Sequence, residues 1–373
     1  MKVLHLSNDF AGSTVHAELY QRLAAAGAEQ VVYCPVRDAA LVGRNAFESE
    51  RTEIIYSPIL KKIHRLFFHL KIKDLVKDVE QKVDLSKIDV VHATTLFSDG
   101  AVALQLKKRY GIPYIVAVRN SDINVFMRYM PHLWTVHREV IRHAEKVVFI
   151  SPNLRQRVTR HWTLVGLSKV LAQKGVVIAN GLNDYWLAHH GASPAAKSHS
   201  VAYVGKFDSN KNVLRLMHAV LQLRQRIPDL RLNLVGGGGE RERHVLQLVA
   251  SHPECFTYHG LIFDKPILQS IYQHCSVMAM PSKKETFGLV YLEAMSQGLR
   301  VLYTRGEGID GLFNKRVGEK VDPYSVRGIE KALERLLLTP EAYDALDAAD
   351  FEAFRWSSIA EHYCEIYNNI IMR

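Results

Sequence analysis

The sequence predicts an α/β protein built from two doubly wound domains, each with a parallel sheet covered by helices. Short runs rich in Val and Ile alternate with amphipathic stretches of helical length. Uninterrupted apolar runs of this kind are typical of strands buried on both faces of a sheet. The series of runs stops after residue 179 and restarts at residue 200, and a length of 373 residues suffices for about two domains.

The first series predicts seven strands and the second predicts five. The first seven are residues 2–6, 30–34, 53–56, 89–93, 113–118, 146–150 and 175–179. The other five are residues 200–205, 231–235, 256–258, 276–280 and 300–303. Between the two series, residues 192–200 (ASPAAKSHS) are small, polar and contain Pro, as is typical of a linker. We therefore expect one domain over 1–190 and a second over 200–350.

The last segment, residues 351–373, carries apolar side chains at helical spacing. They are Phe354, Ile359, Tyr363, Ile366, Tyr367 and Ile370. Such a helix could complete the second domain or cross back and pack on the first.

Composition excludes several classes of protein. Hydrophobic residues make up 48% of the chain, which is enough for packed cores. No apolar run approaches the roughly 20 residues that a membrane span needs, and the start, MKVLHLSNDF, lacks the features of a signal peptide. The four cysteines are far apart and form no CxxC pair, so neither a disulfide framework nor a Cys-based zinc site organises the fold. We expect a cytoplasmic protein.

The net charge of +10 is distributed unevenly. Residues 1–180 contain 26 basic and 16 acidic side chains, whereas residues 181–373 contain 22 of each. All of the excess positive charge therefore lies in the first half, which predicts an anionic partner for that half.

Ligands of open parallel sheets bind at the carboxyl ends of the strands, so the loops there are the candidate sites. After the first strand, Gly12 precedes a helix predicted to start near residue 13 or 14, where backbone can approach an anion. The loop is not GxGxxG, and no acid closes the second strand, which argues against a dinucleotide-dependent dehydrogenase. Gly12 is equally consistent with an ordinary loop glycine.

Two loops of the second half carry charge or glycine. Lys206 and Lys211 follow the strand at 200–205, and paired ammonium groups there suit a diphosphate. Residues 236–239 are four glycines, beginning with Gly236, which allow a tight turn close to a ligand. Alternatively, the two lysines are solvated surface residues, and the glycines form only a flexible connection.

The segment 281–298, PSKKETFGLVYLEAMSQG, carries the strongest signal. Glu285 and Glu293 are eight residues apart, so a helix beginning near 286–288 places them about two turns apart on a similar face. The free amides of Phe287, Gly288 and Leu289 would then form an anion site. Alternatively, Glu285 interacts only with the helix dipole and Glu293 is exposed to solvent.

Taken in order, these segments resemble retaining GT-B glycosyltransferases of family 4, which transfer a sugar from a nucleotide-diphosphate donor. The resemblance covers nearly the whole chain. Its motifs are VFISPNLRQRV, VVIANGLNDYW, AYVGKFDSNKNV, the Glu285–Glu293 segment and the pair Phe354 and Trp356. It implies two facing Rossmann-like domains with an interdomain cleft, and a crossover helix in 351–373 that packs on the N-terminal domain.

The resemblance also implies roles for individual residues. Lys206 and Lys211 would bind the diphosphate and stabilise the leaving group, and Glu285 would contact the transferred sugar. Glu293 would hold the ribose hydroxyls. The other implied donor-binding positions are Gly12, Gly236, Phe287, Gly288 and Leu289.

The chain departs from the family pattern at two places. Lys206 stands where the family often has Arg, which keeps the charge but loses a bidentate fork. The strand at 113–118 is followed by RNSD instead of the family's common His, which leaves the acceptor-side polar group open. Candidates for it are His16, which resembles a recurrent family His, and Arg119, Asn120 and Asp122.

The resemblance implies a metal-independent hexosyltransferase without a cofactor, since the nucleotide-sugar is a co-substrate. No DxD sequence occurs in the chain. A leaving diphosphate develops negative charge that ammonium groups and helix amides can stabilise. Transfer would retain the anomeric configuration, with the leaving phosphate helping to deprotonate the acceptor.

Residues 61–73, KKIHRLFFHLKIK, contain five Lys or Arg and no acid. A basic amphipathic helix with aromatic residues is typical of contact with an anionic membrane. The residues expected to make it are Lys61, Lys62, Arg65, Phe67, Phe68, Lys71 and Lys73. The alternative is an ordinary domain helix with solvated lysines.

The sequence therefore favours a glycosyltransferase, peripheral on the inner face of the cell membrane, that builds a bacterial surface polysaccharide or glycolipid on a lipid-linked acceptor. Another GT-B enzyme, such as a nucleotide-sugar epimerase, would use the donor site without an acceptor. A basic nucleic-acid-binding protein would use the +10 charge, but no helix-turn-helix, RNP-like or zinc motif is present in the sequence.

Overall fold

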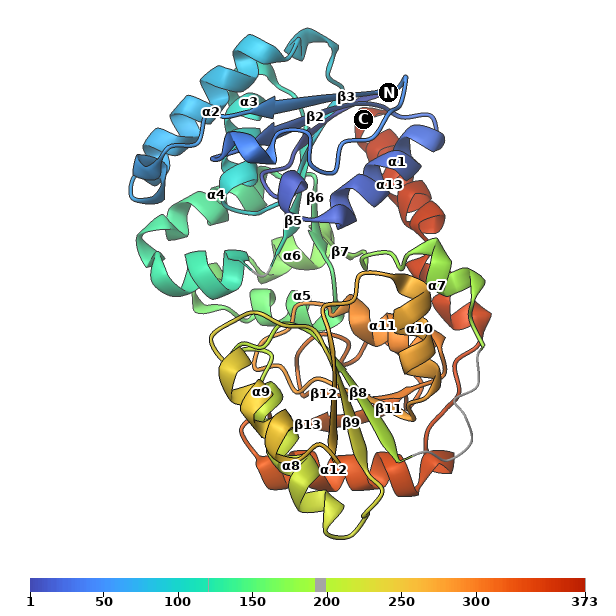
Figure 1. Cartoon of the computed structure of the whole chain (residues 1–373). Helices are drawn as coiled ribbons and strands as arrows, with labels where there is room; N and C mark the ends of the chain where they lie inside the picture. Colours follow the sequence, from blue (N-terminus) through green and yellow to red (C-terminus); the bar gives the residue numbers. More distant parts are fainter. Residues whose placement is uncertain (120, 192–198, 373) are drawn as a thin grey trace. The chain divides into compact units, whose positions relative to one another are not determined.

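The computed structural model describes residues 1–119, 121–191 and 199–372. The chain divides into two compact units (Figure 1). Unit 1 comprises Met1–Gly181 and Trp356–Arg373, and unit 2 comprises Leu182–Arg355. Each contains one parallel sheet flanked by helices, so the predicted doubly wound α/β class is confirmed. Most of the expected linker, residues 192–198, lies outside the described residues.

Unit 1 has a seven-stranded sheet in the order β3-β2-β1-β4-β5-β6-β7, with every pairing parallel. Its strands are β1 (Lys2–Leu6), β2 (Glu29–Pro35), β3 (Thr52–Ser57), β4 (Val90–Ala93), β5 (Tyr114–Val118), β6 (Lys146–Phe149) and β7 (Gly175–Val177). Its helices are α1 (Thr14–Ala25), α2 (Phe68–Lys82), α3 (Ser98–Tyr110), α4 (Trp134–His143), α5 (Pro152–Thr159), α6 (Ser168–Lys174) and α13 (Trp356–Ile371).

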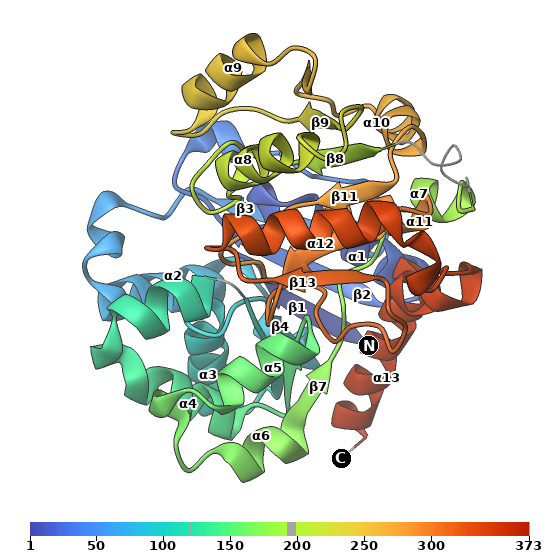
Figure 2. The same ribbon diagram turned by 90° about the horizontal axis from the view of Figure 1, so that it is seen from below.

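Helices cover both faces of this sheet, which explains why its strands show no polar alternation. All five residues of β5 are buried. Ile115 and Ala117 of this strand belong to the core cluster beneath α1 and α13, whereas Val116 points to the other face. There it lies against Gly100 of α3, and a Cβ on Gly100 would come within 2.8 Å of the Val140 side chain in α4. Figure 2 shows α1 and α13 apart from the group α2, α3 and α4.

Unit 2 has a six-stranded parallel sheet in the order β10-β9-β8-β11-β12-β13. Its strands are β8 (Ser200–Val204), β9 (Arg231–Val235), β10 (Phe256–Gly260), β11 (Val277–Ala279), β12 (Arg300–Thr304) and β13 (Gly318–Val321). Its helices are α7 (Asp184–Ala188), α8 (Val213–Arg224), α9 (Glu242–Ser251), α10 (Lys265–Gln273), α11 (Leu289–Ser296) and α12 (Val326–Leu338). In both units the order reverses beside the first strand, and ligands bind at such switch points.

The twelve strands predicted from apolar runs are all present, with bounds that differ by at most two residues. The thirteenth, β13, was not predicted because its sequence, GEKV, is half charged. Gly318 is needed there, since a Cβ would lie 1.9 Å from the carbonyl oxygen of Val301. The buried Glu319 is stabilised by Arg335 at 2.6 Å, by Arg316 at 2.8 Å and by the Tyr343 hydroxyl at 2.9 Å.

Helix α13 belongs to unit 1. It packs along α1, and its buried face contributes Trp356, Tyr363 and Tyr367 to the core cluster. The Tyr367 hydroxyl lies 2.7 Å from Nδ1 of His92 in β4. Gly181 lies directly under Trp356, because a Cβ there would be 2.2 Å from the indole ring.

Residues 61–73 do not form the single helix that was expected. A 3-10 turn spans Lys62–Arg65, and α2 begins only at Phe68. Phe68 is buried, so it cannot make the surface contact expected of it. Lys71 reaches Ser98, where its Nζ donates a hydrogen bond of 2.7 Å to Oγ. The exposed apolar side chains of the segment are Ile63, Leu66, Phe67 and Leu70.

Candidate functional site

The predicted donor residues of unit 2 lie on loops at the carboxyl end of its sheet and in helix α11. The loop after β8 carries Lys206 and Lys211, and the loop after β11 carries Glu285. The two loops meet in an ion pair between Lys211 Nζ and Glu285 Oε2 at 2.6 Å, with only 26% and 13% of the side chains exposed. An additional pair of hydrogen bonds joins them, since Asn210 binds the carbonyl of Lys284 and the amide of Lys283. The sequence predicted these residues individually, and the fold brings Lys211 and Glu285 into contact.

The backbone around Glu285 is held by a loop that sequence reasoning missed. The Glu285 amide donates to Oε2 of Glu307 at 2.9 Å, and the Glu285 carbonyl accepts from the Gly308 amide at 2.8 Å. A side chain on Gly308 would crowd Glu285, because φ is +55° and a Cβ would lie 3.0 Å from Glu285 Cγ. The glycines of RGEGIDG directly after a buried strand were the available signal.

Helix α11 presents the amides predicted to bind an anion. It begins at Leu289, and Gly288 caps it in a left-handed conformation with φ of 79°. Within the described part of the chain, no acceptor is found for the amides of Phe287, Gly288 and Leu289. Only glycine fits position 288, because a Cβ would lie 2.6 Å from the buried ring of Tyr291. The helix therefore starts with free donors and the positive end of its dipole.

Glu293 lies one to two turns into α11 and is half-buried. Burial raises the pKa of its carboxyl to about 7, and the charge of Lys265 opposes this shift. No residue of the described ranges forms an ion pair with it. An ionised carboxylate here gains most from neutral donors such as a pair of hydroxyls, since they would compensate for its lost hydration.

The glycine run after β9 has a steric role beside β8. Gly236 has φ of +136°, and a Cβ on it would lie 1.9 Å from the carbonyl oxygen of Gly205. Its amide donates to the carbonyl of Gly260 at 2.8 Å, so it is not available to a phosphate. Gly238 lies near the aliphatic chain of Lys206, whose side chain is exposed. Gly236 thus lets the two strand ends approach closely.

The predicted residues of unit 1 do not form one polar surface. Gly12 is exposed before α1, and a Cβ on it would lie 2.5 Å from Oδ1 of Asp9. His16 is buried in α1, where desolvation, helped by the charges of Arg119 and His5, lowers its pKa to about 3. It is therefore a neutral imidazole near pH 7.

Arg119 and Asp122 shape the loop after β5. Asp122 is fully buried, and its carboxylate accepts the amides of Leu96, Phe97 and Arg119 at 3.1, 3.1 and 2.8 Å. Burial raises the pKa of Asp122 to about 6 against these hydrogen bonds. Asp122 thus stabilises the loop and does not face solvent, whereas Arg119 is half-buried and reaches Asn180 Oδ1 at 3.2 Å. The candidate Asn120 lies outside the described residues.

Comparison with known proteins identifies the family to which the chain belongs. The profile of the family described as "Glycosyl transferase 4-like domain" matches residues 11–181, and that of "Glycosyl transferases group 1" matches residues 198–339. The chain is a glycosyltransferase of the GT-B fold.

A D-inositol 3-phosphate glycosyltransferase of Pseudarthrobacter chlorophenolicus is 26% identical over 393 residues, covering 98% of this chain and 92% of the relative. Among solved structures, sucrose-phosphate synthase from Thermosynechococcus elongatus has a TM-score of 0.76 at 21% identity, covering 100% of this chain and 99% of that one. Anabaena HepE in complex with UDP and glucose has a TM-score of 0.68 at 17% identity, covering 99% and 100%.

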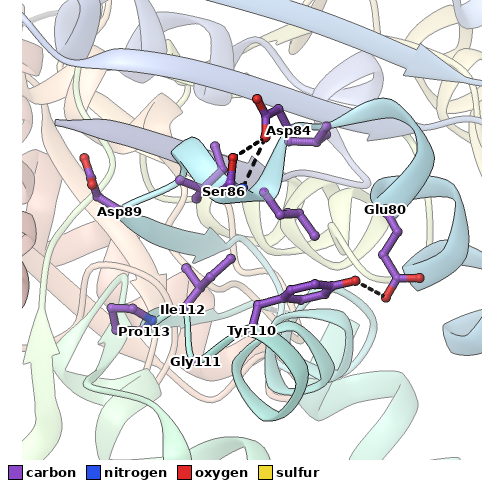
Figure 3. Close-up of a pocket in the computed structure, with 11 residues that line it drawn as sticks. Glu80, Asp84, Ser86, Asp89, Tyr110, Gly111, Ile112 and Pro113 are labelled. Carbon is purple, nitrogen blue, oxygen red and sulfur yellow. Dashed lines mark hydrogen bonds between the residues drawn. The ribbon is translucent and has the colours of Figure 1, made fainter.

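The glycosyltransferase also has a hollow of 710 Å³ at the edge of the unit 1 sheet where the strands begin, opposite the carboxyl edge (Figure 3). It lies where β4 and β5 begin, beside Asp89 and Pro113. Its carboxylates are already engaged: Glu80 binds Arg109 and Tyr110, and Asp84 binds Ser86. Ligands of such sheets bind at the other edge, so we do not assign the site here.

Two features are absent from the described part of the glycosyltransferase. Nowhere in the ranges 1–119, 121–191 and 199–372 do three His, Cys, Asp or Glu side chains gather in a way that could hold a metal ion. No helix within these ranges is long and apolar enough to cross a membrane.

Proposed function

We propose that the enzyme transfers a hexose from a nucleotide-diphosphate donor, bound by unit 2, to a lipid-linked glycan acceptor bound by unit 1. The ion pair between Lys211 and Glu285 beside the free amides of α11 carries the donor assignment. It gathers one ammonium, one carboxylate and a helix N-terminus at the carboxyl edge of a parallel sheet. Anions bind at such helix termini, and a sugar hydroxyl can donate to the carboxylate. That HepE was solved with UDP and glucose supports a nucleotide-sugar donor.

In this proposal the diphosphate lies between the α11 amides and the two lysines. The Lys211 ammonium, which pairs with Glu285, also interacts with the phosphates as the bond between the sugar and the phosphate oxygen breaks. Lys206 adds a second positive charge. Fixed donors of this kind stabilise the negative charge that develops on the leaving group. Glu285 contacts the sugar, and Glu293 accepts hydrogen bonds from the ribose hydroxyls.

We propose retention of configuration without a metal ion. The Glu285 carboxylate already accepts the Lys211 ammonium at 2.6 Å and the Thr286 amide at 3.2 Å. Both carboxylate oxygens of Glu285 therefore already accept a hydrogen bond, and in this proposal the departing phosphate oxygen takes the acceptor proton on the same face of the sugar. Proton NMR of the fresh product gives its anomeric configuration, and an inverted product would contradict the proposal.

The experiment that tests donor use is a binding and product screen. UDP-, GDP- and ADP-hexoses are titrated calorimetrically and then incubated with the enzyme, with and without lipid-linked glycans. Transfer or slow hydrolysis is the expected outcome. An epimerised nucleotide-sugar would favour the alternative enzyme class, and binding of none of the donors would refute the assignment.

We also propose that unit 1 docks on an anionic membrane, at the cytoplasmic face. Unit 1 holds 27 basic and 18 acidic residues, whereas unit 2 holds 21 and 20. Leu66 and Phe67, 82% and 56% exposed, lie among Lys61, Lys62 and Arg65, and Lys73 follows in α2. Exposed apolar side chains flanked by cations favour an acidic bilayer.

Cosedimentation with vesicles tests this docking. We expect salt-sensitive binding to phosphatidylglycerol vesicles, weak binding to phosphatidylcholine vesicles and no binding to duplex DNA. The double variant Leu66→Ser, Phe67→Ser should lose binding, whereas Trp162→Ser, which removes another exposed ring of unit 1, should not. Equal binding by both variants would contradict the assigned surface.

A further inference from the structure

Unit 1 contains a cavity of 280 Å³ at the carboxyl edge of its sheet, which we call the basic pocket. It lies between the loop after β2, the start of α2 and the loop after β5. Its nine described lining residues include five Arg, Lys or His and no acid. They are Arg37, His64, Arg65, Leu66, Phe68, Lys71, Phe126, Met130 and His132. A pocket with this lining attracts an anion.

The cations of the basic pocket are only partly compensated. Arg65 is exposed and forms no ion pair with any residue that the structure describes. Arg37 is occupied by a neutral partner, the carbonyl of Lys61, at 2.6 Å. Lys71 donates to the hydroxyl of Ser98 at 2.7 Å, and burial lowers its pKa, with Asp99 opposing and Arg37 adding to the shift. An anion in the pocket would relieve this excess of positive charge.

The start of α2 adds to the same field. The helix has 15 residues, no side-chain cap and no acid in its first turn. Its first residue, Phe68, lines the basic pocket, so the positive end of the helix dipole lies at the pocket wall. The nearest acid along the helix, Asp74, is taken by His64, whose Nε2 lies 3.0 Å from Oδ2.

One side of the basic pocket is apolar and fixed. The Phe126 ring stacks on Phe97 with centroids 4.7 Å apart and contacts Phe68 edge to face at 6.1 Å. Met130 extends this wall, and Leu66 at the rim is 82% exposed. A free inorganic anion would leave this surface wet, whereas an anion attached to an alkyl group would cover it.

We propose that the basic pocket binds the phosphate group of an amphiphilic acceptor, with Arg65 and Lys71 on the phosphate and Phe126 and Met130 against the alkyl part. Guanidinium and ammonium groups beside a helix N-terminus match a phosphate in charge and geometry. The volume is near the lower end of the roughly 300–1,000 Å³ of small-ligand sites, as a head group requires. This inference rests on the proposed transferase function and names the substrate class that unit 1 accepts.

The test is calorimetric titration of the full-length enzyme with octyl phosphate below its micellar concentration. We expect octyl phosphate to bind at least tenfold more tightly than octanol, octanoate or inorganic phosphate. Arg65→Gln and Lys71→Met should each weaken binding about tenfold, as expected for one charge-assisted hydrogen bond. The matched control Lys77→Met removes an exposed lysine of the same helix outside the pocket and should bind like the wild type.

Three outcomes would overturn the inference. If both pocket variants bound octyl phosphate with wild-type affinity, the phosphate would not lie in the basic pocket. Equal binding of inorganic phosphate would show that the apolar wall contributes nothing, and equal binding of octanoate would refute the phosphate assignment. Nucleotide titration of the same variants separates this failure from that of the proposed function, because the donor residues lie in unit 2. Loss of octyl phosphate binding with unchanged nucleotide binding supports the inference.

Discussion

Replacing Gly288 by Ala tests whether the start of α11 is built for its free amides. Position 288 has φ of 79°, and a left-handed conformation costs an L-residue about 1–2 kcal/mol. The new Cβ would also lie 2.6 and 2.7 Å from two carbons of Tyr291. That ring cannot move away easily, because it is buried and its hydroxyl donates to the Met280 carbonyl at 2.5 Å. Overpacking of this kind costs about 1–3 kcal/mol, which gives about 2–5 kcal/mol in total.

Gly311→Ala is the matched control. Gly311 has φ of +77° in the same unit, but no atom lies within 4 Å of its added Cβ. The Gly311→Ala variant should therefore lose only the backbone strain of about 1–2 kcal/mol from its free energy of unfolding. Hydrogen exchange of the slowest amides in β8 and β11 reports the free energy of unfolding of unit 2, and calorimetry with the best nucleoside diphosphate reports the site. We expect Gly288→Ala to lower the free energy of unfolding more than Gly311→Ala does, and to weaken nucleoside diphosphate binding at least tenfold. Equal losses in the two variants would refute the reasoning.

Three further predictions concern charge. Lys211→Met should weaken donor binding about 10–100-fold, as expected for the loss of a hydrogen bond between charged groups. The control Lys331→Met, on the exposed face of α12, should leave donor binding unchanged. Equal calorimetric affinities of the two variants would contradict the assigned site. Glu293 has a pKa of about 7 and binds hydroxyls as the anion, so donor affinity should fall below pH 7 by up to about tenfold per pH unit, and Glu293→Gln should abolish this dependence. The pKa of buried His5 is lowered to about 3, so the unfolded chain binds a proton that the folded chain does not. Its contribution to stability is lost as the pH falls from 6.5 towards 3, and His5→Leu should flatten the urea-unfolding free energy against pH by about 1.4 kcal/mol per unit.

The fold could be predicted because most strands are largely buried and so appear as short apolar runs, although β3, β7 and β10 are less buried. The exception, β13, shows the limit of that signal. Glu319 in β13 is tolerated because Arg316, Arg335 and Tyr343 surround its carboxylate, and these partners come from separate segments. A pattern within one strand contains no information about such partners.

The site was predictable to a different degree. Residues at strand ends, such as Lys211 and Glu285, could be identified individually, because the carboxyl edge of a parallel sheet gathers its loops. Their contact at 2.6 Å depends on how the loops after β8 and β11 fold, which no spacing in the sequence specifies. Gly236 was assigned to the donor, but its amide is used within the sheet and its role is steric. Asp122 was a candidate for the acceptor side because RNSD stands where the family commonly has His. Its carboxylate instead accepts the nearby Arg119 amide and, from a distant segment, the amides of Leu96 and Phe97.

The return of the chain to unit 1 through α13 has a consequence for biosynthesis. Unit 2 is one uninterrupted segment, whereas unit 1 lacks Trp356, Tyr363 and Tyr367 until the ribosome has passed them. During that interval α1 and the strands beneath it expose an apolar groove and leave His92 without the Tyr367 hydroxyl. Unit 2 can therefore fold without α13, whereas unit 1 cannot be completed without it. A released chain truncated after Arg355 should contain a protected unit 2 and a unit 1 that proteases still cut.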